Sequence, residues 1–340
     1  MAITEHTART ERHTTFYLAA GPEDGPLIIF VHGWPELSIS WRHQLPALAA
    51  LGFRAIAPDM RGYGRSTVYD RYSDYAQESI VRDMIDLIDD VGRERAVWVG
   101  HDWGSPVVWN VASHHPERCI AVASLCVPYF TLERGLDHTL TLVDRELYPE
   151  KEFPYGQWDY MRHYEENFAG AIAPMDANVR NSVKLLFRKG LPAGEGQPAI
   201  TASARRNRGL FGGAMPDVPR DGDVLTEEDL CVYVSALERT GFFGPSSWYM
   251  NHSANAEYSK TACFDGYLDM PALFLNARYD YVCECTHSRL AEPMRAFCRN
   301  LTELTIRSGH WMAQEKPLEV NAALAKWIVT SVSEAWPEPK

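Results

Sequence analysis

Short apolar runs alternate with amphipathic stretches along most of this chain. Six runs, each bounded by Gly, Pro or charged residues, have the length and composition of buried strands: Leu27–Val31, Phe53–Ala57, Ala96–Val99, Ile120–Leu125, Ala272–Leu275 and Leu301–Ile306. Between the runs, apolar residues recur at helical spacing, as in Val81–Ile88 and Val320–Ile328. Strands that alternate with helices predict an α/β fold, with a mostly parallel twisted sheet flanked by helices.

The alternation stops in the middle of the chain. Residues 129–268 are rich in Tyr, Arg, Pro and Gly and contain no clear buried strand. We therefore expect a core made of two pieces, residues 1–128 and residues 269–340. A mostly helical domain, residues 129–268, is expected to be inserted between two of the core strands.

Two local patterns occur within this inserted part. Thr226 followed by Asp229 is a capping-box pattern, and it predicts a helix over Leu225–Leu237. The stretch Lys189–Gly222 is rich in Gly and Pro and shows no period, so we expect a long excursion loop there.

The charge balance narrows the possible function classes. The chain has 340 residues, with 33 Lys and Arg against 45 Asp and Glu, and its formal net charge is -12. An acidic chain has no general attraction to nucleic acid or to anionic lipid, so we expect neither as a partner. No apolar run approaches the ~18 residues of a membrane-spanning helix, and the polar N-terminal segment has no signal-peptide pattern. We expect a cytoplasmic protein.

The seven cysteines give no sign of a disulfide framework or a zinc site. No CxxC pair occurs, and Cys283 and Cys285 form only a CxC. We therefore expect reduced and mostly buried thiols.

The strand that ends near Val99 leads into a pattern with candidate chemistry. Gly100-x-Asp102-x-Gly104 lies where a strand passes into a helix, which is the setting of a nucleophile elbow. The central residue is Asp102 instead of Ser, and no G-x-S-x-G occurs in the chain, which disfavours a serine esterase or lipase. The alternative interpretation is that Asp102 only caps the helix that follows.

Two further candidate residues, an aspartate and a histidine, each follow one of the later predicted strands. Asp280 comes a few residues after the run Pro271–Asn276, and His310 lies in the turn after the run that ends at Ile306. Nucleophile, acid and histidine, each just past the carboxyl end of a strand, is the chain order of the α/β-hydrolase triad. Open sheets bind ligands at these strand ends.

Three motifs together resemble the epoxide hydrolases of the α/β-hydrolase superfamily, and the match covers nearly the whole chain. The motifs are His32–Glu36, Asp59–Ser66 and Gly100–Gly104. The resemblance implies that the backbone N–H groups of Trp34 and Trp103 form an oxyanion hole and that their indole rings line the substrate pocket. It also implies that the inserted domain is a cap.

The cap contains candidates for the tyrosines that open an epoxide ring in this family. Gly241–Tyr249 resembles the cap motif that ends in such a tyrosine, which points to Tyr249. Trp158–Arg162 resembles the other segment and points to Tyr160. Tyr164, one helical turn later, is the alternative, because the residues after it depart from the aromatic-Gln-Glu-Pro run that is common in the family.

The resemblance implies a two-step reaction between an epoxide and water. Asp102 attacks an epoxide carbon and forms a covalent ester, while the cap tyrosines stabilise and protonate the ring oxygen. His310, held by Asp280, then activates the water that hydrolyses the ester to a vicinal diol. The aromatic lining favours an apolar or aryl epoxide, and this chemistry requires no metal and no cofactor.

Three alternatives remain beside this interpretation. Haloalkane dehalogenases share the Asp nucleophile and the Trp after it, but they bind halide with a second donor, commonly Asn at the position of Trp34 or a cap Trp. Fluoroacetate dehalogenases would carry Arg in place of Trp103. The third alternative is a hydrolase fold that binds a small hydrophobic ligand without catalysis, and the presence of Asp102, Asp280 and His310 together argues against it.

Overall fold

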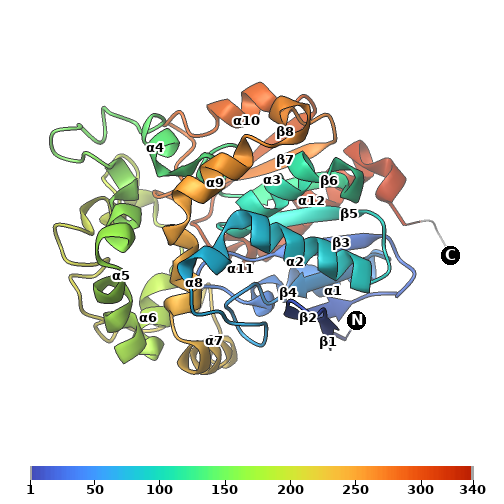
Figure 1. The fold of residues 1–340 in the computed structure, drawn as a ribbon, viewed down its shortest axis with the longest axis horizontal. Coiled ribbons are helices and arrows are strands. Elements are labelled where there is room, and N and C mark those ends of the chain that lie inside the picture. The colour runs from blue at the N-terminus through green and yellow to red at the C-terminus, as the bar shows by residue number, and fades with distance from the viewer. Residues whose placement is uncertain (1, 338–340) are drawn as a thin grey trace.

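The computed structural model describes residues 2–337, and within them the strands form one eight-stranded sheet (Figure 1). The strands are β1 (Thr4–Arg9), β2 (Thr14–Ala20), β3 (Leu27–Val31), β4 (Arg54–Pro58), β5 (Ala96–His101), β6 (Cys119–Leu125), β7 (Ala272–Ala277) and β8 (Leu301–Ile306). Their order is β1-β2-β4-β3-β5-β6-β7-β8. The β1–β2 and β2–β4 pairs are antiparallel and the other pairs are parallel. The predicted α/β fold with a mostly parallel sheet is confirmed.

The six predicted apolar runs correspond to β3 through β8, with ends that differ by no more than about two residues. The two N-terminal strands, β1 and β2, were not among the sequence predictions. They form an antiparallel hairpin at one edge of the sheet, where most side chains of β1 are exposed. Because both faces of β1 are largely in water, its sequence carries no apolar periodicity and gives no strand signal, whereas most residues of β2 are buried.

Helices cover both faces of the sheet, and as a result every residue of β3 and β5 is buried. Helices α2 and α3 pack on each other and on the sheet, and α1 and α12 form a second such pair. The helices of the core are α1 (Gln44–Ala50), α2 (Gln77–Asp90), α3 (Gly104–His114), α10 (Glu292–Phe297), α11 (Met312–Glu315) and α12 (Pro317–Ser331). Both helices expected from periodicity, α2 and α12, are present.

The chain between β6 and β7 is helical, and the structure, which describes all of it, places no strand there. Its helices are α4 (Gly135–Leu140), α5 (Asp159–Ala177), α6 (Val179–Leu186), α7 (Glu227–Thr240), α8 (Phe243–Ser247) and α9 (His252–Ser259). Figure 1 shows α5, α6 and α7 to one side of the sheet, on the left of the view. This segment therefore adds a helical layer beside the core sheet.

Both local predictions for this segment are confirmed. Thr226 and Asp229 form the reciprocal capping box at the start of α7, with each side chain accepting a hydrogen bond from the other residue's backbone N–H. Residues 189–222, all of which the structure describes, contain only short 3-10 turns. In residues 2–337, no helix has both the length and the apolar character needed to cross a bilayer.

Candidate active site

Asp102 lies at a sharp turn between β5 and α3. Its backbone has φ = 50°, a left-handed conformation that is rare for a residue with a side chain and that is typical of a nucleophile elbow. The turn needs small neighbours, because a Cβ atom on Gly104 would lie 2.2 Å from the carbonyl oxygen of Val31. In the described chain the N-terminus of α3 receives no side-chain capping hydrogen bond, so the interpretation of Asp102 as a simple helix cap is wrong.

The three predicted triad residues come together at the carboxyl ends of the strands. His310 Nδ1 lies 2.6 Å from Asp280 Oδ2, and His310 Nε2 lies 3.4 Å from Asp102 Oδ2. The second oxygen of Asp280 accepts hydrogen bonds from the backbone N–H groups of Val282 and Cys283, both at 3.0 Å. Asp280 is therefore fixed on both sides and can hold the imidazole in one orientation.

The charges of this group affect one another strongly. Burial by itself would lower the pKa of His310, but Asp280 and Asp102 together raise that pKa well above its ordinary value. Burial would raise the pKa of Asp280, whereas His310 and the two backbone N–H groups lower it overall. With Asp102 ionised, the imidazolium form of His310 is favoured between the two carboxylates.

One oxygen of Asp102 is held by a backbone donor. The backbone N–H of Trp34 donates to Asp102 Oδ1 at 2.7 Å. A Cβ atom on Gly33 would lie 2.4 Å from that oxygen and 2.6 Å from the backbone nitrogen of Trp103, so only glycine fits at this position. The amide nitrogens of Trp34 and Trp103 thus lie near the same carboxylate, which is the arrangement of an oxyanion hole.

The two predicted cap tyrosines pack on each other, and Tyr249 also packs on the two tryptophans whose amides lie near this carboxylate. The ring of Tyr249 lies 5.2 Å from the indole of Trp103, 5.9 Å from that of Trp34 and 5.5 Å from the ring of Tyr160, measured between centroids. Burial raises the pKa of both Tyr160 and Tyr249 well above its ordinary value. Both phenols are therefore protonated at neutral pH and can donate a hydrogen bond.

Tyr160 and Tyr164 both lie on the same side of α5, but their hydroxyl groups have different surroundings. The pKa of Tyr160 is raised first by burial and then by Cys283 and Asp102, while His310 lowers it, so this phenol lies in the field of the triad. The pKa of Tyr164 is raised by burial and lowered by a hydrogen bond with Ser246. The ring of Tyr164 stacks on that of Tyr249 at 4.8 Å. Of the two phenols, only Tyr160 has a pKa on which Asp102 and His310 act.

Comparisons with known proteins agree with this geometry. A family model described as "alpha/beta hydrolase fold" matches residues 26–168. The chain is 35% identical over 329 residues to epoxide hydrolase A of Mycobacterium tuberculosis, and the alignment covers 96% of this chain and 98% of the relative. The chain belongs to the epoxide hydrolases of the α/β-hydrolase fold. It is a hydrolase.

Two more matches place this epoxide hydrolase among its relatives. The crystal structure of epoxide hydrolase A from Mycobacterium thermoresistibile matches with a TM-score of 0.80 at 31% identity, covering 97% of this chain and 99% of the other. Bifunctional epoxide hydrolase 2 of Sus scrofa is 33% identical over 307 residues, which are 90% of this chain. The chain spans about half of that relative's length, since the alignment covers 52% of it.

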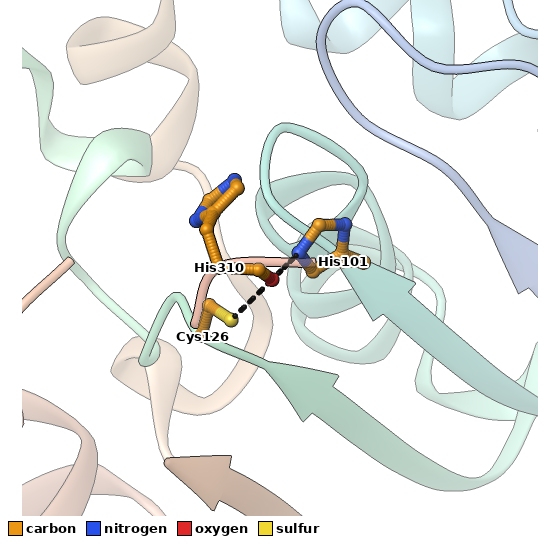
Figure 2. Close-up of side chains that lie close together, drawn as sticks. All are labelled: His101, Cys126 and His310. Carbon is orange, nitrogen blue, oxygen red and sulfur yellow. Dashed lines mark hydrogen bonds between the residues drawn. The ribbon is translucent and has the colours of Figure 1, made fainter. Parts of the chain in front are cut away.

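The epoxide hydrolase also contains a buried network that the sequence interpretation missed. His101 hydrogen-bonds Glu36 through Nδ1 at 2.7 Å and the backbone oxygen of His310 through Nε2 at 2.8 Å. Cys126 donates from Sγ to the same oxygen at 3.3 Å (Figure 2). Figure 2 shows the imidazole of His310 pointing away from these two bonds, which therefore fix the backbone below the ring.

The network carries a buried charge pair. Burial disfavours the charged form of His101, but Glu36 outweighs it and raises the pKa of His101 above its ordinary value. Burial would raise the pKa of Glu36, whereas His101 lowers it overall. Both residues belong to the motifs named in the sequence: Glu36 ends His32–Glu36, and His101 lies within Gly100–Gly104. Their positions were therefore visible in the sequence, although their pairing was not.

Some of these side chains have metal-ligand chemistry. In residues 2–337, His101, Cys126 and His310 form one set of three whose ligand atoms lie within 4.8 Å of one another, and Asp280, Cys283 and His310 form a second. Within these sets His310 is hydrogen-bonded to Asp280, and Cys126 and His101 both hydrogen-bond the backbone oxygen of His310. Five of the seven cysteines are buried and all seven are free thiols, as the sequence predicted.

Proposed function

We propose that this enzyme converts an epoxide to a vicinal diol through a covalent ester on Asp102. One observation carries the proposal: the carboxylate at the elbow has one oxygen bound by the Trp34 N–H, and the other faces His310. A nucleophile held in this way can attack a saturated carbon, and the resulting ester already has its carbonyl oxygen beside backbone donors. The substrates are an epoxide and water.

In the first step Asp102 Oδ2, the oxygen that Trp34 does not bind, attacks one epoxide carbon. The bond between that carbon and the ring oxygen breaks, and the electron pair stays on oxygen. Tyr249 and Tyr160 hydrogen-bond this oxygen as charge develops, and one of the phenols gives it a proton. The products of the step are a hydroxyalkyl ester of Asp102 and a phenolate.

In the second step water attacks the carbonyl carbon of the ester. Esterification removes the charge of Asp102, which is one of the groups that raise the pKa of His310, so the imidazole becomes a free base at this stage. His310 takes a proton from water, and the backbone N–H groups of Trp34 and Trp103 stabilise the oxyanion, each by about 3 kcal/mol. Collapse gives the diol, which takes one proton of water, and the other returns to the phenolate.

The substrate class and the domain arrangement form part of the same proposal. The rings of Trp34, Trp103 and Tyr249 next to the carboxylate favour an apolar or aryl epoxide. Residues 129–268 act as a cap that brings Tyr160 and Tyr249 to the core, which comprises residues 1–128 and 269–340. No step of this reaction uses a metal or a cofactor.

Isotope labelling in a single turnover tests the ester mechanism. With enzyme in excess over styrene oxide in water enriched in heavy oxygen, the label is expected in Asp102 and not in the first diol, because the diol takes its second oxygen from the carboxylate. Later turnovers should release labelled diol. The Asp102→Asn variant, examined at the same concentration, should form no diol. Label in the first-turnover diol would contradict the covalent mechanism.

One observation favours haloalkane dehalogenation as the second candidate. Among the described residues, Trp103 Nε1 is buried and has no hydrogen-bond partner, so it can donate to a halide. The corresponding atom of Trp34 is already engaged, because it donates to Ser246 Oγ at 3.3 Å. A halide-release assay on a series of small haloalkanes, run beside an epoxide panel, separates the two. Diol formation without halide release supports the epoxide hydrolase.

A further inference from the structure

His252, at the start of α9, is a buried histidine without hydrogen bonds. The residue is only 5% exposed. In the part of the chain that the structure describes, neither its Nδ1 nor its Nε2 has a hydrogen-bond partner. The indole Nε1 of Trp103 is likewise buried and unpartnered. The two rings are neighbours, with 6.3 Å between their centroids. These two neighbouring rings thus carry three buried nitrogen atoms, Nδ1 and Nε2 of His252 and Nε1 of Trp103, that make no hydrogen bond.

Such an arrangement is costly unless something else satisfies it. A buried polar atom that makes no hydrogen bond loses its solvation without compensation, and native proteins keep few such atoms. Burial lowers the pKa of His252 to about 4, so its imidazole is neutral at physiological pH. The neutral ring offers one N–H donor and one acceptor nitrogen, and Trp103 adds one further donor.

The pair lies on the wall of the proposed active site. Trp103 directly follows the nucleophile Asp102, and its indole packs edge to face on Tyr249 at 5.2 Å. His252 comes three residues after Tyr249, so it projects from the same short segment as a proposed ring-opening phenol. The indole of Trp103 therefore neighbours both the proposed ring-opening phenol and the imidazole of His252.

We propose that Trp103 Nε1 and the imidazole of His252 form a polar subsite for a hydroxyl group carried by the epoxide substrate a few atoms from the ring. A hydroxyl is the substituent that uses both sides of the pair: its oxygen accepts from the indole N–H, and its hydrogen is donated to the bare imidazole nitrogen. This inference rests on the proposed function and adds one requirement to its substrate class: a hydroxyl group on an otherwise apolar epoxide.

Matched substrate pairs test the subsite. The pairs are 1,2-epoxybutane with 3,4-epoxybutan-1-ol, 1,2-epoxypentane with 4,5-epoxypentan-1-ol, and 1,2-epoxyhexane with 5,6-epoxyhexan-1-ol. An apolar pocket disfavours every alcohol, because the hydroxyl must leave water without a partner. With the subsite, kcat/KM for the alcohol should exceed that of its alkyl partner by roughly tenfold at one chain length.

Substitution of His252 assigns the effect to this residue. His252→Phe keeps a ring and removes both nitrogens, so the ratio of alcohol to alkyl kcat/KM should fall by about tenfold or more. His252→Gln keeps a donor and an acceptor and should retain part of the preference. His114, whose ring nitrogens bond the backbone oxygens of Asn110 and Tyr258, gives the control His114→Phe, for which the ratio should stay at the wild-type value.

The outcomes separate this inference from the proposed function. If the wild-type enzyme forms diol from all the alkyl epoxides and prefers no alcohol, the subsite is wrong and the proposed function stands. The same conclusion follows if His252→Phe leaves the ratio unchanged. If the enzyme forms diol from none of the six epoxides, the proposed function fails for this substrate class and the subsite fails with it.

Discussion

The Nε2 atom of His310 lies 3.4 Å from Oδ2 of Asp102, so the charge of this carboxylate acts directly on the imidazole. While Asp102 is ionised, this contact helps to keep the pKa of His310 well above its ordinary value. Conversion of the carboxylate to an ester removes that contribution. The contact therefore links the two proposed steps, since the first step lowers the pKa of His310 and so frees the neutral imidazole to act as the general base of the second.

Replacing His310 with Gln should block the second step and leave the first. Without a general base, hydrolysis of the ester slows by at least about a hundredfold, whereas the attack of Asp102 on the epoxide needs no histidine. Intact-mass spectrometry of the variant mixed with styrene oxide should show the protein plus the mass of one epoxide. The control is His114→Gln, which should turn over normally. Slow turnover of His310→Gln without any adduct would contradict the assignment.

Replacing Asp280 with Asn should change both the rate and its pH dependence. The variant loses the carboxylate that orients His310, so ester hydrolysis should fall by about a thousandfold or more. Asp280 also raises the pKa of His310, so its removal lowers that pKa. Because hydrolysis requires the neutral imidazole, the rate rises with pH through this pKa, and the variant should reach its plateau at a lower pH. Single-turnover hydrolysis rates between pH 5 and pH 9 measure the shift, and a shift to higher pH would exclude this role for Asp280.

Substitutions of the two tyrosines of α5 should have different effects on the rate of the alkylation step. Asp102 and His310 act on the pKa of Tyr160, whereas burial and Ser246 act on that of Tyr164. Tyr160→Phe should slow alkylation by about tenfold to a hundredfold, and combination with Tyr249→Phe should abolish it. Tyr164→Phe, the matched control, should slow it by less than about threefold. Stopped-flow tryptophan fluorescence reports the step, and equal losses for Tyr160→Phe and Tyr164→Phe would contradict the choice of Tyr160.

This choice also marks where the sequence stops being informative. Tyr160 and Tyr164 are four residues apart in α5, so they project from neighbouring turns on one side of the helix and periodicity does not separate them. By contrast, Asp102, Asp280 and His310 could be placed together from the sequence, because each follows a parallel strand and the carboxyl ends of such strands share one edge of the sheet. The first case depends on tertiary contacts and the second on topology.

The missed features have similar physical reasons. The bond between His101 and Glu36 joins residues 65 positions apart, and neither residue type indicates a buried partner, since Glu is usually exposed and His is intermediate in burial. His252 lies near the end of the helical segment between β6 and β7, with no periodic pattern around it. Strand β1 is polar because it lies at the edge of the sheet. The His101–Glu36 bond, the surroundings of His252 and the place of β1 in the sheet all depend on contacts between segments that are distant in the sequence.

Glu133 should make the stability of the protein fall as the pH rises. This carboxyl group is fully buried; Oε2 accepts from the backbone N–H of Thr131 at 3.0 Å, and within residues 2–337 Oε1 has no partner. Burial raises its pKa to about 7, against 4.5 ordinarily. Below pH 4.5 both the folded and the unfolded states hold the proton and nothing is lost. Between pH 4.5 and 7 only the unfolded state releases it, so the free energy of unfolding falls, by about 3 kcal/mol at most.

The variant Glu133→Gln removes this titration and keeps the acceptor for Thr131. Its melting temperature should exceed that of the wild-type protein at pH 8, because at that pH the wild-type protein must bury a carboxylate or pay for its protonation. At pH 4.5 the two melting temperatures should differ much less. Glu11→Gln, at an exposed position, should show no such difference between the two pH values. A wild-type protein more stable than Glu133→Gln at pH 8 would mean that the Glu133 carboxylate is stabilised where it lies, contrary to the burial argument.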